Sequence, residues 1–167
     1  MGLIVIVAIM AVAMFAGCVE EEAPTPTPTP TPEIEQSTEY PMVDPNSYAT
    51  GTPERALAEY LNCWKQEDWD RMIEFTQKTW RSGEEDPAEL LKDWYDFKHL
   101  VGAEITKKTV VSDTCADVEA KVYYCAFSAT VATEKKITAR VIRESAPYTP
   151  SSTGDWGVNP QSALREE

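Results

Sequence analysis

Three side chains that could act as an acid or a base lie close together just past the middle of this 167-residue chain. Asp93 and Asp96 flank two aromatic residues, and His99, the only histidine, follows shortly after. A general base has to lie in a cavity where burial adjusts its pKa. A lone histidine near a helix end more often interacts with the helix dipole, and a solvated helix face explains the two aspartates. With no His/Asp dyad, Gly-x-Ser-x-Gly, phosphate loop or dinucleotide fingerprint, the sequence predicts no catalytic residue.

Four cysteines offer thiol chemistry or metal ligation. They lack Cys-x-x-Cys spacing, and one histidine is too few for a usual zinc site, so we predict no metal and no cofactor. Cys115 and Cys125 lie roughly 33 Å apart along an extended strand and should not pair with each other. The candidate disulfide joins Cys63 to Cys125, and the alternative is a set of buried free thiols.

The fourth cysteine follows an uncharged apolar run over residues 3–16, in the sequence Ala16-Gly17-Cys18. This resembles the signal segment and lipobox of prokaryotic lipoproteins, in which the cysteine after the cleavage site carries the lipid. The resemblance implies a signal peptide over residues 1–17, lipid on Cys18, and a location at the extracytoplasmic face of the cell membrane. The alternative is an uncleaved anchor, because residues 2–19 are uncharged, no Lys or Arg precedes them, and a bilayer needs about 20 apolar residues.

Residues 18–50 are predicted to be a disordered, acidic, Pro/Thr-rich spacer. Pro24 to Pro32 alternates strictly with threonine. Each proline fixes its backbone near the polyproline II conformation and removes a donor, so neither helix nor sheet can form there. Nine residues at ~3.1 Å each predict a semi-rigid rod of roughly 28 Å.

The charge is distributed unevenly along the chain, whose net charge is −13. The first 50 residues hold seven acidic side chains and no Lys or Arg, whereas the remaining 117 hold 21 acidic and 15 basic ones. Lys and Arg form no stripe there, which argues against a nucleic-acid partner. All five tryptophans follow residue 50, so we expect one folded domain over residues 51–160 and a C-terminal tail over 161–167.

Helix signals come first in this domain. Thr52-Pro53, Asp68 and Asp86-Pro87 are predicted to begin three helices, because Ser, Thr and Asp cap helix N-termini and proline suits the first turn. Leu57, Leu61 and Trp64 fall at helical spacing in the first helix. The third helix is expected to bury Leu90, Leu91, Trp94, Phe97 and Leu100 and to stop at Gly102.

The apolar period then changes from 3.6 to 2. Strands are predicted over residues 104–112, 116–131, 135–145 and 156–158, with a bulge or bend near 123–126 where the apolar set shifts from even to odd positions. Helices followed by a curved antiparallel sheet make an α+β fold.

The opening segment, Thr-Pro-Glu-Arg-Ala-Leu-Ala-Glu-Tyr-Leu-Asn-Cys-Trp-Lys-Gln-Glu-Asp-Trp-Asp-Arg-Met, resembles the start of nuclear-transport-factor-2-like domains. The closing Gly-Asp-Trp-Gly-Val-Asn-Pro resembles their last strand. The resemblance covers about residues 52–160 and implies N-terminal helices packed on a curved sheet that encloses a cone-shaped pocket. Archaeal and bacterial lipoproteins with one such domain on a Pro/Thr spacer look similar, and the resemblance fits an archaeal origin.

Three functions stay open for this domain. The first is a non-catalytic binding module for a small apolar ligand in the cone or for a cell-surface protein. The second is a pocket enzyme of the isomerase or dehydratase type, with an acidic, histidine or tyrosine side chain pointing into the cavity. The third is a structural domain that forms a homodimer through its sheet. The candidate pocket residues are Trp64, Trp94, Tyr123, Tyr124 and Phe127.

Overall fold

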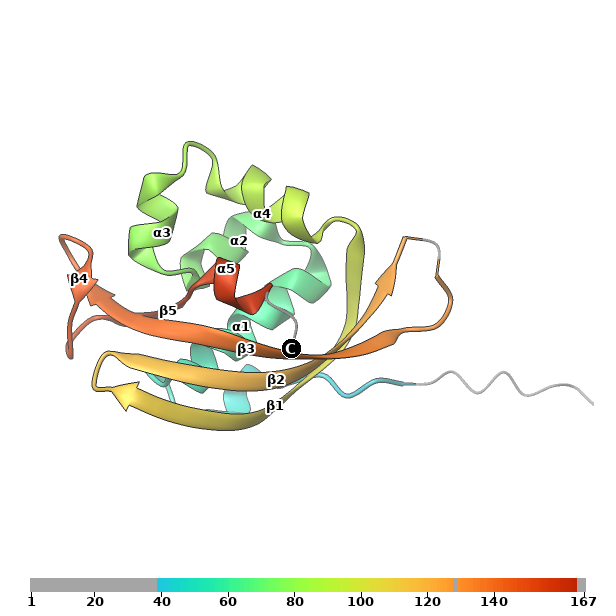
Figure 1. Cartoon of the computed structure of the whole chain (residues 1–167), viewed down its shortest axis with the longest axis horizontal. Coiled ribbons are helices and arrows are strands. Elements are labelled where there is room, and N and C mark those ends of the chain that lie inside the picture. Colours follow the sequence, from blue (N-terminus) through green and yellow to red (C-terminus); the bar gives the residue numbers. More distant parts are fainter. Residues whose placement is uncertain (1–38, 128, 165–167) are drawn as a thin grey trace, which may run out of the picture. The chain divides into compact units, whose positions relative to one another are not determined.

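The computed structural model describes residues 39–127 and 129–164 (Figure 1). Within these ranges the chain forms helices and a five-stranded antiparallel sheet, which confirms the predicted α+β class. The predicted signal segment, Cys18 and most of the spacer lie outside the described residues. No helix within those ranges combines the length and the apolar character needed to cross a membrane.

Helix α1 (Pro53–Gln66) begins where the sequence predicts it. The side chain of Thr52 accepts a hydrogen bond from the backbone N–H of Arg55 at 3.3 Å, and proline occupies the first helical position. The helix ends at Glu67, whose φ of 55° is left-handed and whose N–H donates to the carbonyl of Trp64. The N–H of the next residue donates to the carbonyl of Cys63, which completes a Schellman motif.

Three short helices and a 3-10 turn follow α1. They are α2 (Trp69–Met72), the 3-10 helix Ile73–Phe75, α3 (Lys78–Gly83) and α4 (Pro87–Tyr95). Asp68 and Asp86 cap α2 and α4 as predicted, each accepting a hydrogen bond from the backbone N–H three residues later. Helix α3 was not predicted.

Helix α4 is shorter than the sequence predicts. The prediction extended it through Leu100 to a stop at Gly102, whereas it ends at Tyr95 and β1 begins at Lys98. Gly102 lies inside this strand, where the backbone of the segment before α1 passes close to it. A Cβ at this position would lie 2.6 Å from the carbonyl oxygen of Pro41. The glycine therefore marks a close approach of backbones and not a helix end.

The sheet has the order β1–β2–β3, with β4 and β5 both pairing β3. Its strands are β1 (Lys98–Ser112), β2 (Cys115–Ala126), β3 (Thr133–Ser145), β4 (Thr149–Pro150) and β5 (Asp155–Val158). Strand β2 ends at Ala126 and not at Val131, because Phe127 adopts a left-handed φ of 50° that no strand continues through. The bulge predicted near residues 123–126 is present in the pairing of β1 with β2. Its extra residue, however, is Val101 of β1 and not a residue of β2.

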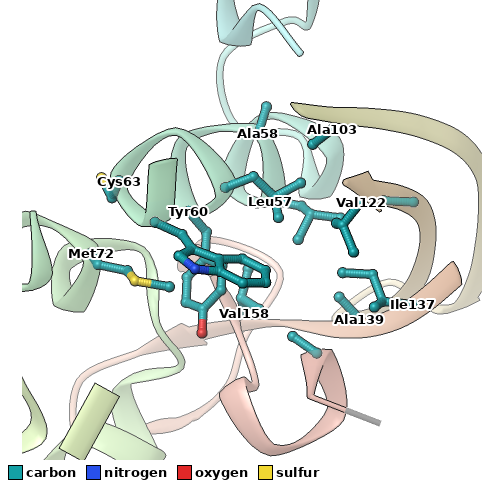
Figure 2. Close-up of a cluster of buried hydrophobic side chains, with 14 of the residues drawn as sticks. Leu57, Ala58, Tyr60, Cys63, Met72, Ala103, Val122, Ile137, Ala139 and Val158 are labelled. Carbon is teal, nitrogen blue, oxygen red and sulfur yellow. The ribbon is translucent and has the colours of Figure 1, made fainter. Parts of the chain in front are cut away.

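The core lies between α1 and one face of the sheet. Residues alternate along β2 between buried and half-buried, so only one face of the sheet is covered. Figure 2 shows Leu57 and Tyr60 of α1 facing Val122, Ile137 and Ala139 of the sheet, and all five are buried.

The folded unit is longer than the predicted 51–160 at both ends, since described residues on both sides of that range belong to it. Before residue 51, Val43 is buried, Met42 forms a parallel bridge with Ala103, and residues 45–47 form a 3-10 helix. After residue 160, the short helix α5 (Pro160–Ala163) packs on β3 (Figure 1), and Ala163 is buried. The predicted spacer and tail therefore each contribute residues to the domain.

Candidate functional site

The interior between the helices and the sheet is filled by side chains. Trp64 packs on Tyr95 with ring centroids 4.5 Å apart, and its Nε1 donates to the carbonyl of Lys98 at 2.8 Å. The hydroxyls of Tyr60 and Tyr95 share a hydrogen bond of 2.9 Å. The cavity left beside Trp64 and Tyr124 measures about 10 Å³, which is the space of at most one water. The expected cone-shaped pocket is therefore closed among the described residues.

The two buried tyrosines are core groups. Burial raises the pKa of Tyr60 well above its ordinary value, and the neighbouring Tyr95 raises it further. Burial also raises the pKa of Tyr95, although the hydrogen bond from Tyr60 lowers it in part. Both hydroxyls therefore stay protonated at neutral pH, and neither serves as a base.

The structure brings only two of the five candidate pocket residues together. Trp64 of α1 and Tyr124 of β2 are buried beside the same small cavity. Trp94 instead packs against Trp80 of α3, with ring centroids 5.8 Å apart. A single pocket lined by these side chains is therefore not formed.

The other two candidates lie outside the core. Tyr123 is on the outer face of the sheet and stacks on Tyr40 at 5.1 Å. Phe127 is 77% exposed and stacks on Phe97 at 6.2 Å. These two aromatic pairs lie toward one end of the sheet, where β2 finishes and β1 begins.

The acid and base candidates also face away from the core. Asp93 and Asp96 are exposed on and just after α4. His99 is in β1, and its Nδ1 lies 2.6 Å from Oε1 of Glu67. The side chains of this pair are about half exposed, at 50% and 48%. The only candidate of this kind that points inward is Tyr124, and it meets no cavity large enough for a substrate.

An open groove of about 790 Å³ lies instead where the chain joins the sheet. We call it the N-terminal groove. It is lined by Glu39, Tyr40, Pro41, Met42, Lys65, Val101, Cys125, Thr130 and Ala132. One wall is the segment before α1, which is held to β1 by a hydrogen bond of 2.8 Å from the N–H of Ala103 to the carbonyl of Pro41. Of the lining residues, only Cys125 is a candidate from the sequence alone, because the others come together only through the fold.

A second groove of about 510 Å³ lies at the start of α1. Its two arginines already have partners. Arg55 forms an ion pair with Glu59 at 2.8 Å. Arg143 lies over the ring of Trp156 at 5.8 Å and donates to the carbonyl of Gly154 at 2.8 Å. These contacts fix the two guanidinium groups in place, so we regard this groove as part of the scaffold.

The three cysteines of the described region carry free thiols, so the predicted bridge between Cys63 and Cys125 is not formed in this structure. Cys63 is buried at the end of α1, where burial raises the pKa of its thiol to about 11 against the lowering effect of Arg71. Cys125 is half-buried and lines the N-terminal groove. Among the described residues no group of three His, Cys, Asp or Glu side chains is placed to hold a metal ion.

The outer face of the sheet carries a series of ion pairs. Arg140 binds Asp117 through two hydrogen bonds of 2.9 and 3.0 Å. The other pairs are Lys107–Glu119 at 2.8 Å and Lys121–Glu134 at 3.8 Å. Alternating charges of this kind do not make the apolar face expected for a homodimer that forms through the sheet.

Comparison with known proteins gives a likeness of fold. No known family and no curated protein matches the sequence. A crystal structure of a SEC-C-motif-containing protein from Psychrobacter arcticus is similar, with a TM-score of 0.52 and 12% sequence identity. The match covers 67% of this chain and 60% of that chain. At this identity the similarity concerns the arrangement of helices and sheet, and it does not extend to function.

Proposed function

We propose that this chain is a membrane-tethered extracytoplasmic lipoprotein whose lipid is attached to Cys18. The support is the order of its parts in the sequence: an uncharged apolar run, then Ala16-Gly17-Cys18, then an alternating Pro/Thr segment, then the residues that form an α+β domain. The domain itself is proposed to be of the nuclear-transport-factor-2-like type, and the support is the sequence resemblance over residues 52–160 together with a long first helix that leads through a capped turn into α2.

The domain is proposed to act as a non-covalent binding module that binds its partner on its surface and not in its interior. The observation that carries this proposal is the contrast between the filled interior, with about 10 Å³ left, and the open N-terminal groove of about 790 Å³. Ligand sites are usually concave surfaces with a mixture of apolar and polar groups, and the groove has this composition. Its occupant is proposed to be a segment of a cell-surface protein.

The tether is tested with Cys18→Ser in the full chain, produced in a prokaryotic host, with Cys115→Ser as the matched control. We expect the control to remain in the membrane fraction and to carry a lipidated N-terminal cysteine by mass spectrometry. The Cys18→Ser chain should lose the lipid and keep residues 1–17. A lipid-free parent chain that retains residues 1–17 in the membrane would instead establish an uncleaved anchor.

The groove is tested by photocrosslinking in the same cells. A photoreactive side chain at Ala132 lies in the groove, and one at Val111 lies 55% exposed near the other end of β1. We expect a discrete protein adduct from position 132, lost when Thr130→Arg narrows the groove, and no adduct from position 111. Identical adducts from both positions would refute a binding role for the groove.

A further inference from the structure

We propose that Cys125 is a reactive thiol that exchanges with disulfides, that His99 accepts its proton, and that Glu67 is the positioning residue for His99. This inference goes beyond the proposed binding function and does not depend on the membrane tether. It rests on a cysteine of β2 that lines the N-terminal groove, its cross-strand partner in β1, and the residue that follows α1.

The register of the sheet places the thiol beside the imidazole. His99 and Cys125 are directly opposite each other in the antiparallel pairing of β1 and β2. Opposite residues project from the same face with Cβ atoms about 4.5–5.5 Å apart. Nδ1 of His99 is occupied by Glu67, so Nε2 is the nitrogen left for the thiol. The resting structure has no hydrogen bond between these two described side chains, and such contacts often tighten only when a substrate binds.

Glu67 occupies an unusual position for a carboxylate. It is the left-handed residue that ends α1, with a φ of 55°, where glycine is strongly favoured. A glutamate there is strained, and its side chain reaches Nδ1 of the histidine at 2.6 Å. A carboxylate on Nδ1 fixes the ring and stabilises the imidazolium that forms when Nε2 takes a proton.

Cys125 is also the thiol with access to a substrate. It lines the N-terminal groove together with Lys65 and Glu39, so a substrate bound in the groove would meet its thiol. Cys63 is 1% exposed and has a pKa of about 11, so it is a poor nucleophile. Cys115 is half-buried like Cys125, but it lies at the far end of β2, away from the groove, and the chain has no second histidine to serve it.

The reaction balances without a further oxidant. The Cys125 thiol gives its proton to Nε2 of His99, and the thiolate attacks one sulfur of a disulfide R–S–S–R. A new S–S bond forms to Cys125 as the old one breaks, and the departing thiolate takes the proton from the imidazolium. The products are a mixed disulfide on Cys125 and one free thiol, RSH.

The test measures exchange at each cysteine in the full chain carrying Cys18→Ser, which removes the N-terminal thiol. The probe is dithiodipyridine, an uncharged aromatic disulfide whose reaction releases a coloured thiopyridone, and peptide mass spectrometry identifies the modified cysteine. We expect Cys125 to react at least about tenfold faster than Cys115, and Cys63 to react only after unfolding. Equal rates at Cys125 and Cys115 would overturn the proposal.

Two variants separate chemistry from structure. His99→Ala should slow Cys125 by about tenfold, leave Cys115 unchanged, and recover its rate with added imidazole. Glu67→Gly should slow Cys125 several-fold while raising the midpoint of thermal unfolding, because glycine relieves the left-handed strain. A merely structural role for Glu67 would give no loss of rate in the more stable variant. Unchanged exchange in His99→Ala would refute the assignment of the base, whatever the tether and groove experiments show.

Discussion

The buried carboxylate of Glu144 offers a sharp test of the packing between α3 and the sheet. Glu144 is 2% exposed in β3. Its oxygens accept hydrogen bonds from Nε2 of Gln77 at 2.9 Å, from the N–H of Thr79 at 2.9 Å, and from Oγ1 of Thr79 at 2.7 Å. All three donors are neutral, so the charge is stabilised by hydrogen bonds at the first turn of α3.

Glu144→Gln keeps the size of the side chain and removes one acceptor. One end of the new amide is an NH₂ group, which then faces donors of Gln77 or Thr79. Losing charged hydrogen bonds and leaving buried donors unpaired costs about 2–3 kcal/mol. At roughly 3 °C per kcal/mol for a domain of this size, the melting temperature at pH 7 should fall by about 6–9 °C. Glu134→Gln, on the exposed outer face, is the control and should shift it by less than about 2 °C.

The pH dependence gives the second half of this test. Burial alone raises the pKa of Glu144, but the hydrogen bonds from Gln77, Thr79 and the backbone of Lys78 outweigh it and hold the pKa below its ordinary value of 4.5. A lowered folded pKa means that the stabilisation is fully present above the unfolded pKa and is lost as pH falls through the folded one.

Urea unfolding of parent and Glu144→Gln should therefore differ most at pH 7, and the difference should shrink once pH falls below about 4. A difference under about 0.5 kcal/mol at pH 7, or one of the same size at pH 3, would refute this account of the network.

The remaining predictions concern α1, the core and the outer face. Tyr95→Phe leaves the buried hydroxyl of Tyr60 without its partner at 2.9 Å and should cost about 1–2 kcal/mol in urea unfolding, whereas the double Phe variant should recover part of it. Glu67→Gly should raise the free energy of unfolding by about 1 kcal/mol, since glycine adopts a φ of 55° freely; a loss would contradict the strain argument. Asp117→Asn removes the two-bond contact to Arg140, whose side chain is 51% exposed, and should cost less than about 1 kcal/mol in thermal unfolding.

Local chemistry in the sequence predicted the starts of the helices and the faces of the strands. Thr52, Asp68 and Asp86 all act as N-caps because a cap needs only the residue and the backbone that follows it. Val118, Ala120 and Val122 likewise alternate with more polar residues. Such an alternation predicts a strand wherever one face of a sheet is covered.

Contacts between distant residues explain the elements that the sequence did not predict. Phe97 and Leu100 continue the helical spacing of α4, but their types are also common in strands. From Lys98 onward the chain forms a strand because it pairs with β2. Helix α3 has no side-chain cap of its own, and its first turn is held by Glu144, some 65 residues away in the sequence. Neither contact can be predicted from the neighbouring residues in the sequence alone.

The same limit applies to the candidate site. Cys125 and His99 each stand out by residue type, but only the register of β1 against β2 makes them neighbours, and only the turn after α1 brings Glu67 to the histidine. The five aromatic residues expected in one pocket show the converse, because their apolar character predicts burial or stacking without saying which neighbour each will meet.

The filled interior has a consequence for where function can reside in this fold. Trp64, Tyr60 and Tyr95 occupy the space between α1 and the sheet, and their polar atoms are already hydrogen-bonded. A ligand could enter there only by displacing a packed aromatic ring, at a cost of about 3–5 kcal/mol for each ring removed. The N-terminal groove needs no such rearrangement, and it holds Cys125, whose cross-strand neighbour is the chain's only histidine. Binding and thiol chemistry are therefore both expected at the N-terminal groove, beside residues 39–42.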